Sequence, residues 1–286
     1  MNHERRIIRA EILGYCMGVR RAVEAAEQAL LENPLRPVYT YGPLIHNSSA
    51  LERLSAAGII ILNENEDDLP EDFGGKTVVI RAHGVPPSVR TELERRNACI
   101  VDATCPRVLS SQKRAKSYSE KGYTVILVGD KNHGEIAGIA GYAPGCIVLE
   151  NREDVLQLKS YPQKSVLISQ TTISQNEYDA IAEELSRHIP YLTVFNTICP
   201  ATLERQDALR ELAGQVEGII VIGGKNSANT LRLYNTACEL SGRVWHIENP
   251  DEMPEEIFFL TRIGITAGAS TPDDLINSVE QALQKV

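Results

Sequence analysis

Runs of β-branched and other apolar residues recur three times along the chain, and each run ends close to a cysteine. The runs cover residues 7–13, 99–103 and 191–195, and the cysteines that follow them are Cys16, Cys105 and Cys199. A helical pattern of apolar positions comes after each cysteine. The intervals are similar, 89 residues from 16 to 105 and 94 residues from 105 to 199. This spacing predicts a threefold internal repeat.

The later strands of each repeat also correspond. The second strand (VYTY, VILVG and IIVIGG) and the fourth strand (TVVIRAHG, SVLISQTT and RIGITAGAS) each lead into a polar turn. These turns contain His46, His133 and Ser227 after the second strands, and His83, Thr171 and Ser270 after the fourth strands. Each repeat therefore reads strand, helix, strand, helix, strand, strand, helix. The closing helices are expected near residues 86–96, 174–187 and 272–284.

This order of elements predicts the α/β fold class, with three pseudo-threefold-related units that contain mainly parallel sheets and right-handed crossovers. We expect the units at residues 1–97, 98–190 and 191–286. Ligands of parallel α/β sheets bind beyond the carboxyl ends of the strands, where helices begin. The cysteines and turn residues named above all fall there. A helix cap explains a single Ser or Thr at such a turn, but capping does not explain three equivalent cysteines.

Charge and composition limit the kinds of partner that the protein can bind. The 286 residues include 29 Lys and Arg against 38 Asp and Glu, a net charge of -9, which has the wrong sign for a protein that binds nucleic acid. The first residues lack the apolar run of a signal peptide, and no stretch approaches the roughly 20 apolar residues of a membrane span. We therefore expect a cytoplasmic protein without a membrane partner, in which six cysteines are thiols, metal ligands or redox groups rather than disulfides.

The three repeated cysteines suit a metal cluster. No two cysteines form a CxxC pair, so the usual zinc spacings are absent. Three thiolates at helix N-termini around a pseudo-threefold axis would instead hold a central iron-sulfur cluster. On a 4Fe-4S cube they leave one iron without a protein ligand, free to act as a Lewis acid while the cluster delivers electrons. A single cysteine is more often a packing residue, and that is what we expect of Cys99, Cys146 and Cys238.

Several motifs together give a specific resemblance. The chain resembles the IspH (LytB) family of 4-hydroxy-3-methylbut-2-enyl diphosphate reductases nearly end to end. The motifs are GYCMGVRRAVE, GPLIHN, RAHGV, DATCP, HGEIAG, SQTT, ICPAT followed by RQ, GGKNSANT and TAGASTPD. The resemblance implies a trefoil of three domains around one 4Fe-4S cluster. It also implies the last step of the non-mevalonate isoprenoid route, in which two electrons from a ferredoxin or flavodoxin and two protons remove an allylic hydroxyl as water.

The resemblance also implies roles for individual residues. Cys16, Cys105 and Cys199 match the cluster ligands. The residues that match the groups holding the substrate diphosphate are His46, His83, Ser227, Asn229 and Ser270. His133 and Glu135 match a histidine and an acid near the reacting carbon, and Thr171 matches a hydroxyl that orients the substrate or relays a proton. Two positions depart from the family pattern, because Ala228 replaces a frequent Ser and Gly134 replaces a frequent Pro.

The residues themselves are compatible with these roles. Helix N-termini supply N–H groups and partial positive charge to a diphosphate without a cluster of Lys or Arg, which suits an acidic protein with an anionic substrate. GGKNSANT lacks the spacing of a P-loop, which disfavours nucleotide triphosphate chemistry. Glu135 could supply the proton that the departing hydroxyl needs. It could equally be a helix first-turn acid that the dipole favours.

Two other functions remain open from the sequence. The first is an enzyme of the quinolinate synthase type, which also uses three cluster cysteines in threefold α/β units but catalyses a dehydrating condensation. The HGEI and TAGAS turns argue against it. The second is a zinc-stabilised binding module that uses three Cys and one His. A brown protein with cluster absorption, rather than a colourless one, would separate an iron-sulfur enzyme from this module.

Overall fold

The computed structural model describes residues 5–33, 37–45 and 47–285. Within these ranges, twelve strands form three four-stranded sheets, and the pairings are parallel. The first sheet has the order β3 (Ile59–Leu62), β2 (Val38–Tyr41), β4 (Thr77–Ile80), β5 (Cys99–Asp102). The second has the order β7 (Ile147–Leu149), β6 (Thr124–Val128), β8 (Lys164–Ser169), β9 (Tyr191–Phe195). The third has the order β11 (Val244–Ile247), β10 (Gly218–Ile222), β12 (Arg262–Ala267), β1 (Arg6–Arg9).

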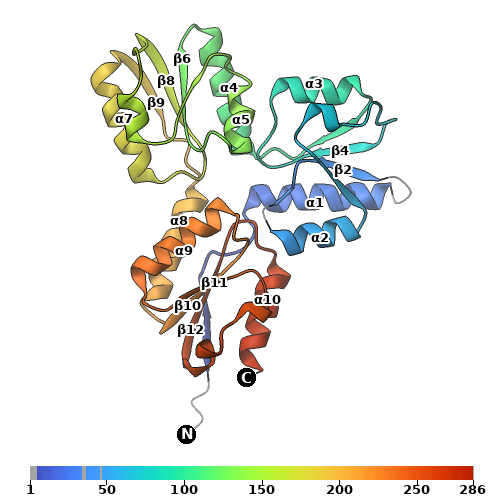
Figure 1. Ribbon diagram of the computed structural model, residues 1–286, viewed down its shortest axis with the longest axis vertical. Coiled ribbons are helices and arrows are strands. Elements are labelled where there is room, and N and C mark those ends of the chain that lie inside the picture. Colours follow the sequence, from blue (N-terminus) through green and yellow to red (C-terminus); the bar gives the residue numbers. More distant parts are fainter. Residues whose placement is uncertain (1–4, 34–36, 46, 286) are drawn as a thin grey trace. The chain divides into compact units, whose positions relative to one another are not determined.

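Helices connect the strands in chain order (Figure 1). They are α1 (Met17–Glu32), α2 (Ser48–Ala56), α3 (Pro87–Arg95), α4 (Pro106–Glu120), α5 (Gly134–Ala140), α6 (Arg152–Leu156), α7 (Gln175–His188), α8 (Pro200–Ala213), α9 (Ala228–Leu240) and α10 (Asp273–Gln284). Short 3-10 helices lie at Glu66–Asp68, Pro250–Glu252 and Glu255–Phe259. The expected closing helices are α3, α7 and α10, so the sequence located them to within one residue at each end.

Side chains of the second sheet alternate between its two faces, as the pleat requires. On one face, Ile126, Val128 and Leu167 pack with Tyr178, Ile181 and Leu185 of α7. On the other face, Val125, Leu127, Val166 and Ile168 pack with Ala115 of α4 and with Ile136 and Ile139 of α5. Figure 1 shows this sheet between α7 and the pair α4 and α5. Burial on both faces explains why its central strands are continuously apolar in the sequence.

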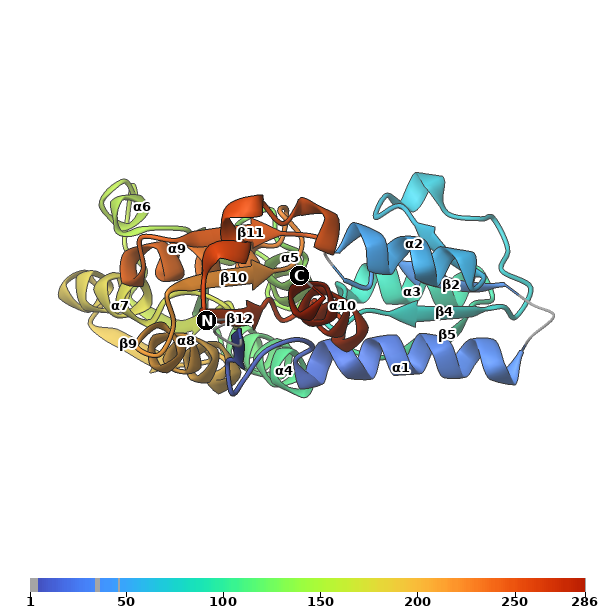
Figure 2. The same ribbon diagram turned by 90° about the horizontal axis from the view of Figure 1, so that it is seen from below.

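The third sheet is built in the same way. Ile220, Ile222, Ile263 and Ile265 pack with Ile276, Val279 and Leu283 of α10. Ile219 and Val221 pack on the other face with Leu209 and Leu212 of α8 and with Leu233 and Ala237 of α9. Figures 1 and 2 show α10 on one side of β10 and β12, and α8 and α9 on the other. None of the helices in the described ranges is long and apolar enough to cross a membrane.

The sheets divide the chain differently from the expected units at 1–97, 98–190 and 191–286. The strand that opens each expected unit pairs with the last strand of the unit before it: β5 pairs with β4, β9 with β8, and β1 with β12. Of the helices expected to close the units, α3 and α7 are therefore crossovers to the next strand, whereas α10 is the last element of the described chain. A repeating order of strands and helices is the same whichever strand is counted first, so the pattern alone does not fix the boundary.

Contacts along the described chain also separate two compact units rather than three. One comprises Met1–Val23, Pro43–Ile59 and Pro200–Val286, and the other comprises Glu24–Gly42 and Ile60–Cys199. The third sheet belongs to the former and the second sheet to the latter. Each unit is therefore assembled from separate stretches of sequence.

The three remaining cysteines correct a second expectation. Cys99 and Cys238 are exposed rather than buried, and Cys146 is half-buried. Cys99 is the first residue of the edge strand β5, and Cys238 follows Ala237, which α9 presents to the sheet. Successive residues on a helix point about 100° apart, so Cys238 is turned away from the core. Burial raises the pKa of the Cys146 thiol.

Candidate functional site

The candidate site residues follow the central strands of the three sheets. In the first sheet the chain moves outward from β2 to β3 on one side and from β4 to β5 on the other, and the second sheet repeats this order. In the third sheet β10 leads outward to β11, and β1, the first strand of the chain, takes the outer place beside β12. The carboxyl ends of two central strands that lead away in opposite directions form the usual ligand site of open α/β sheets. The residues found there are His83 after β4, His133 after β6, Thr171 after β8, Ser227 after β10 and Ser270 after β12. His46, which follows β2, lies outside the described residues.

The three repeated cysteines make the same backbone hydrogen bond, each at the equivalent place in one of the three sheets. Each N–H donates to a carbonyl just beyond the neighbouring central strand: Cys16 to Ala269 (3.1 Å), Cys105 to Ala82 (2.9 Å) and Cys199 to Thr171 (2.8 Å). Each cysteine directly precedes a helix, namely α1, α4 or α8. The equivalence that the sequence suggested is therefore reproduced in the hydrogen bonding, and it places each cysteine beside Ser270, His83 or Thr171.

The chemistry of these thiols suits an iron-sulfur centre. The three cysteines form no disulfide and are half-buried. The backbone N–H of Val19, in the first turn of α1, points at Cys16 Sγ at 3.5 Å. Cysteine thiolates are the usual ligands of such clusters, and hydrogen bonds to their sulfur atoms tune the cluster. In the part of the chain that the structure describes, no three His, Cys, Asp or Glu side chains by themselves form a group that could hold a metal ion.

Glu135 is a buried acid with two specific partners. Its carboxylate accepts the N–H of Thr171 at Oε1 (2.7 Å) and the hydroxyl of Thr171 at Oε2 (2.7 Å). The side chain is only 1% exposed. Burial raises the pKa of Glu135 from 4.5 to about 7, and the two hydrogen bonds from Thr171 offset only part of that rise. The carboxyl group is therefore poised to hold or release a proton near neutral pH.

Thr171 is the partner of this acid and follows the end of β8. It is 8% exposed, more than Glu135. When Glu135 is ionised, the Thr171 hydroxyl donates to it. When Glu135 is protonated, its O–H can donate to Thr171 Oγ1, which leaves the threonine proton free to donate outward. The geometry of this pair allows a proton to pass between the carboxyl group and the hydroxyl.

His133 and His83 lie beside this pair. Nδ1 of His133 accepts the N–H of Glu135 at 3.1 Å, which caps the N-terminus of α5. The neutral imidazole therefore carries its proton on Nε2, where it can donate to a ligand. The rings of His83 and His133 meet edge to face with centroids 4.8 Å apart. One unit thus brings together His83, His133, Glu135 and Thr171.

A buried arginine supports the turn that carries His133 and Glu135. Arg81 is 4% exposed, and its Nη2 donates to Glu64 at 2.7 Å. The same guanidinium lies against the backbone of Gly134, so that a Cβ at residue 134 would clash with it. The departure from the family's frequent Pro is therefore matched by the packing of Arg81. Neither Pro nor Ala fits at residue 134 while Arg81 keeps this position.

The third sheet holds a separate polar group. Ser227 caps α9 by accepting the N–H of Thr230 at 3.4 Å, and Ser227 Oγ lies 3.5 Å from Ser270 Oγ. Both serines are buried. Nδ2 of Asn229, in the first turn of α9, is also buried and finds no acceptor among the described residues. Two hydroxyls and a free amide at a helix N-terminus are suitable donors to an anion.

Two further residues position the loops, and the sequence did not single them out. Arg205 is buried and donates to the carbonyls of Ala267 (2.8 Å) and Gly14 (3.0 Å), which ties the segment before Cys16 to the end of β12. Gln170 accepts the N–H of Asp130 at 3.0 Å and so joins the turns after β6 and β8. Their only sequence signal was their place inside the RQ and SQTT motifs.

Comparison with known proteins gives a consistent result. Residues 7–284 match a family model described as LytB protein. A 4-hydroxy-3-methylbut-2-enyl diphosphate reductase of Treponema denticola is 50% identical over 283 residues, which cover 96% of this chain and 98% of that protein. A solved structure of (E)-4-hydroxy-3-methyl-but-2-enyl diphosphate reductase, described as the terminal enzyme of the non-mevalonate pathway, has a TM-score of 0.75 and 38% identity, and covers 99% of this chain and 100% of that chain. A solved structure of the E-1-hydroxy-2-methyl-but-2-enyl-4-diphosphate reductase from Plasmodium falciparum has a TM-score of 0.86 and 27% identity, and covers 97% of this chain and 87% of that chain.

Proposed function

Because this chain belongs to the LytB protein family, we propose that it is a 4-hydroxy-3-methylbut-2-enyl diphosphate reductase, the terminal enzyme of the non-mevalonate route. The reaction replaces the allylic hydroxyl of the substrate with hydrogen. It consumes two electrons and two protons, breaks the C–O bond, forms one C–H bond and releases one water. The products are isopentenyl and dimethylallyl diphosphate. The match over nearly the whole chain favours this function over the quinolinate synthase type and over a zinc module.

The observation that carries the proposal is the buried Glu135–Thr171 pair. A hydroxyl leaves as water only if a proton reaches it. With a pKa of about 7, Glu135 retains a proton on a substantial fraction of molecules at neutral pH. The two 2.7 Å hydrogen bonds hold the carboxyl in one orientation and connect it to the Thr171 hydroxyl. Glu135 is accordingly the proton source, Thr171 relays the proton, and the Nε2–H of His133 holds the substrate near the reacting carbon.

Cys16, Cys105 and Cys199 would hold one 4Fe-4S cluster and leave one iron site open. The assignment is supported by their lack of disulfides, their shared backbone hydrogen bond and their places before three helices. Such a cluster, when bound, supplies electrons singly and a Lewis-acidic iron. A protein of the ferredoxin or flavodoxin type would deliver the electrons.

The diphosphate of the substrate would be held by His46, His83, Ser227, Asn229 and Ser270. The free Nδ2 of Asn229 and the paired hydroxyls of Ser227 and Ser270 support the serine and asparagine roles. The N-terminus of α9 adds partial positive charge beside them. A diphosphate accepts many hydrogen bonds, so this mainly neutral set of donors can bind it without neutralising its charge fully.

An anaerobic assay tests the proposed function. The protein is reconstituted with iron and sulfide, supplied with dithionite-reduced methyl viologen, and given 4-hydroxy-3-methylbut-2-enyl diphosphate. We expect mass spectrometry to detect isopentenyl and dimethylallyl diphosphate. Two molecules of reduced methyl viologen, a one-electron donor, should be oxidised for each product molecule. Dimethylallyl diphosphate, which lacks the hydroxyl, should oxidise no viologen. Reconstituted protein with a full complement of iron and no product would overturn the assignment.

A further inference from the structure

Positive charge is concentrated in and around helix α4. Residues 103–128 contain five Lys and Arg and a single acid, Glu120, whereas the rest of the chain contains 24 Lys and Arg against 37 Asp and Glu. Lys164, at the start of β8, lies beside them, because its Nζ donates to the carbonyl of Lys121 at 3.2 Å. The α4 basic surface consists of Arg107, Lys113, Arg114, Lys116, Lys121 and Lys164. A strongly acidic chain thus carries one compact cationic face.

These cations are accessible and hardly neutralised. Arg107, Lys113, Lys116 and Lys121 are exposed. Within the described residues, the ion pair found for this surface joins Lys116 to Glu120 at 3.9 Å, close to the limit for such a contact. Arg9 and Arg20, near the N-terminus, differ from them, because Arg9 pairs with Glu280 and Arg20 with Asp273. The α4 basic surface is therefore a cationic face in which the Lys116–Glu120 contact is the ion pair found among the described residues.

Aromatic rings hold three of these cations in place. Arg114 lies over Phe195 (4.9 Å to the centroid), Lys121 over Tyr118 (5.4 Å) and Lys164 over Tyr123 (4.3 Å). The rings themselves pack edge to face, Tyr118 with Tyr123 at 5.0 Å and with Phe195 at 5.5 Å. Cation–π contacts restrain long flexible side chains, so less conformational entropy is lost when a partner binds. The surface is thus prepared for an anionic partner.

We propose that the α4 basic surface docks an acidic one-electron carrier protein of the ferredoxin or flavodoxin type, an inference that rests on the proposed reductase function. α4 begins directly after Cys105, its N-cap and one of the proposed cluster ligands. Lys116 lies eleven residues beyond it, roughly 17 Å along the helix axis at a rise of about 1.5 Å per residue. A carrier seated on this surface therefore lies next to the segment that would hold the cluster.

Charge complementarity favours an acidic carrier protein as the partner of the α4 basic surface. Two reduced carriers give up one electron each per product and leave oxidised, so the partner must bind and dissociate twice in every turnover. Electrostatic attraction accelerates such encounters without requiring a large interface. The net charge of this chain is -9, so it repels an acidic carrier on average, and the α4 basic surface provides a local attractive approach.

Charge reversal tests the docking surface in the reconstituted holoenzyme. Lys113→Glu/Lys116→Glu alters two exposed lysines that stack on no ring in the structure. With a reduced flavodoxin of acidic surface as donor, we expect the KM for flavodoxin to rise by roughly tenfold or more at low salt. The difference should shrink as sodium chloride screens the charges. Activity with dithionite-reduced methyl viologen should stay at the wild-type level.

Matched variants make the outcome decisive. Arg243→Glu/Lys285→Glu reverses two exposed cations elsewhere with the same change in net charge and should leave the flavodoxin KM unaltered. The flavodoxin KM of Lys113→Gln/Lys116→Gln should lie between that of the wild type and that of Lys113→Glu/Lys116→Glu. An unchanged flavodoxin KM in the α4 variants, or an equal change in the control, would overturn the docking surface while viologen-driven turnover persists. Absence of viologen-driven turnover in the wild type would instead overturn the reductase function itself.

Discussion

A single buried carboxyl group, Glu135, connects this sequence to its chemistry. The sequence left two readings of this residue open, a proton donor and a helix first-turn acid. The structure places it at the first turn of α5, but also buries it and gives both oxygens to Thr171. A first-turn acid that served only the helix dipole would gain nothing from burial. The desolvation that raises its pKa is what makes it suitable as an acid.

Replacing Glu135 by Gln tests that role. The amide keeps the shape and can still accept the Thr171 N–H, but it has no acidic proton to donate. We expect Glu135→Gln to retain iron and to bind substrate normally, while kcat falls by about 10² to 10⁴, the usual contribution of general acid catalysis. Steady-state reduction with methyl viologen, iron analysis and calorimetric binding measure the three quantities. A near-native kcat would leave Thr171 or His133 as the candidate proton source.

The raised pKa of Glu135 also predicts how stability depends on pH. Below pH 4.5 the carboxyl is neutral in both folded and unfolded chains. Between pH 4.5 and about 7 the unfolded chain loses the proton first, so the free energy of unfolding falls as pH rises, and above about 7 the loss is complete. The total is on the order of 3 kcal/mol. Thermal unfolding of the wild type relative to Glu135→Gln should show this decline, and a constant difference from pH 4 to 8 would contradict it.

Gly134 provides a prediction about packing next to the same residue. Gly134→Ala should lower both kcat and the melting temperature, because the added methyl group clashes with the buried Arg81 and displaces the turn between His133 and Glu135. In Gly134→Ala/Arg81→Ala the clash is removed, so the combined loss should be smaller than the sum of the single losses. Gly242→Ala, whose Cβ meets open space, is the matched control. Additive losses would show that the two positions are independent.

For individual residues, the patterns in the sequence predicted functional positions where a cysteine or a polar turn residue recurs at an equivalent place in the three repeats. The cysteines and the turn residues were recognisable because each occurs at an equivalent place in three repeats. Arg81, Arg205 and Gln170 occur once each, and their importance comes from burial and from partners far away in sequence, such as Glu64 and Gly14. Charged residues are mostly exposed, so a sequence gives no reason to expect a buried arginine at these positions.

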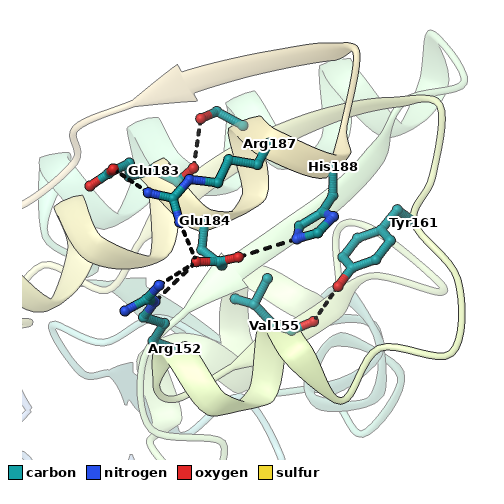
Figure 3. Close-up of polar contacts among 8 residues, drawn as sticks. Arg152, Val155, Tyr161, Glu183, Glu184, Arg187 and His188 are labelled. Atoms are coloured by element: carbon teal, nitrogen blue, oxygen red, sulfur yellow. Dashed lines mark hydrogen bonds and ion pairs between the residues drawn. The ribbon is translucent and has the colours of Figure 1, made fainter.

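At the scale of elements, the apolar pattern located strands and helices well because both faces of the sheets are covered. It did not show which polar side chains connect neighbouring helices. Helix α7 contains such a junction (Figure 3), where Glu184 accepts from Arg152 of α6 (2.6 and 3.1 Å) and from Arg187 (2.9 Å) and contacts His188 (3.2 Å). His188 in turn stacks on Tyr161, with centroids 4.2 Å apart. The hydrogen bond from Arg152, followed by that with His188, lowers the pKa of Glu184.

Glu184→Gln should therefore lower the melting temperature by a few degrees at neutral pH, because it replaces a shared carboxylate between two helices. The contribution of a carboxylate with a lowered folded-state pKa is present above its ordinary pKa and is lost as pH falls through the folded value. The gap between wild type and variant should thus close as the pH drops below 4.5. Glu183→Gln is the control, since Glu183 is 69% exposed and such pairs contribute little. Equal melting temperatures for the wild type and Glu184→Gln at pH 7 would contradict this role.

At the scale of the whole molecule, the sequence identified the threefold repeat, but its pattern did not show which sheet the first strand of each expected unit joins. Strand β5 illustrates why: it follows a helix of one expected unit and precedes the cysteine of the next, and only its hydrogen bonds to β4 decide where it belongs. The same exchange at β9 and β1 means that Cys16, Cys105 and Cys199 each follow an edge strand of a sheet. Local pattern predicts that a strand exists, whereas its neighbours depend on contacts between distant parts of the chain.

The division of the six cysteines into two classes gives a final prediction. Cys16, Cys105 and Cys199 share a backbone hydrogen bond to the neighbouring strand end and a place before a helix, which Cys99, Cys146 and Cys238 lack. Replacing any of the first three by Ser should abolish cluster assembly, because a serine oxygen is a poor substitute for a thiolate toward iron. Cys99→Ser, Cys146→Ser and Cys238→Ser should each keep the wild-type iron content per chain and the brown absorption. Folding is checked separately by thermal unfolding of the metal-free proteins. Loss of iron in Cys238→Ser, together with its retention in Cys199→Ser, would overturn the assignment of the ligands.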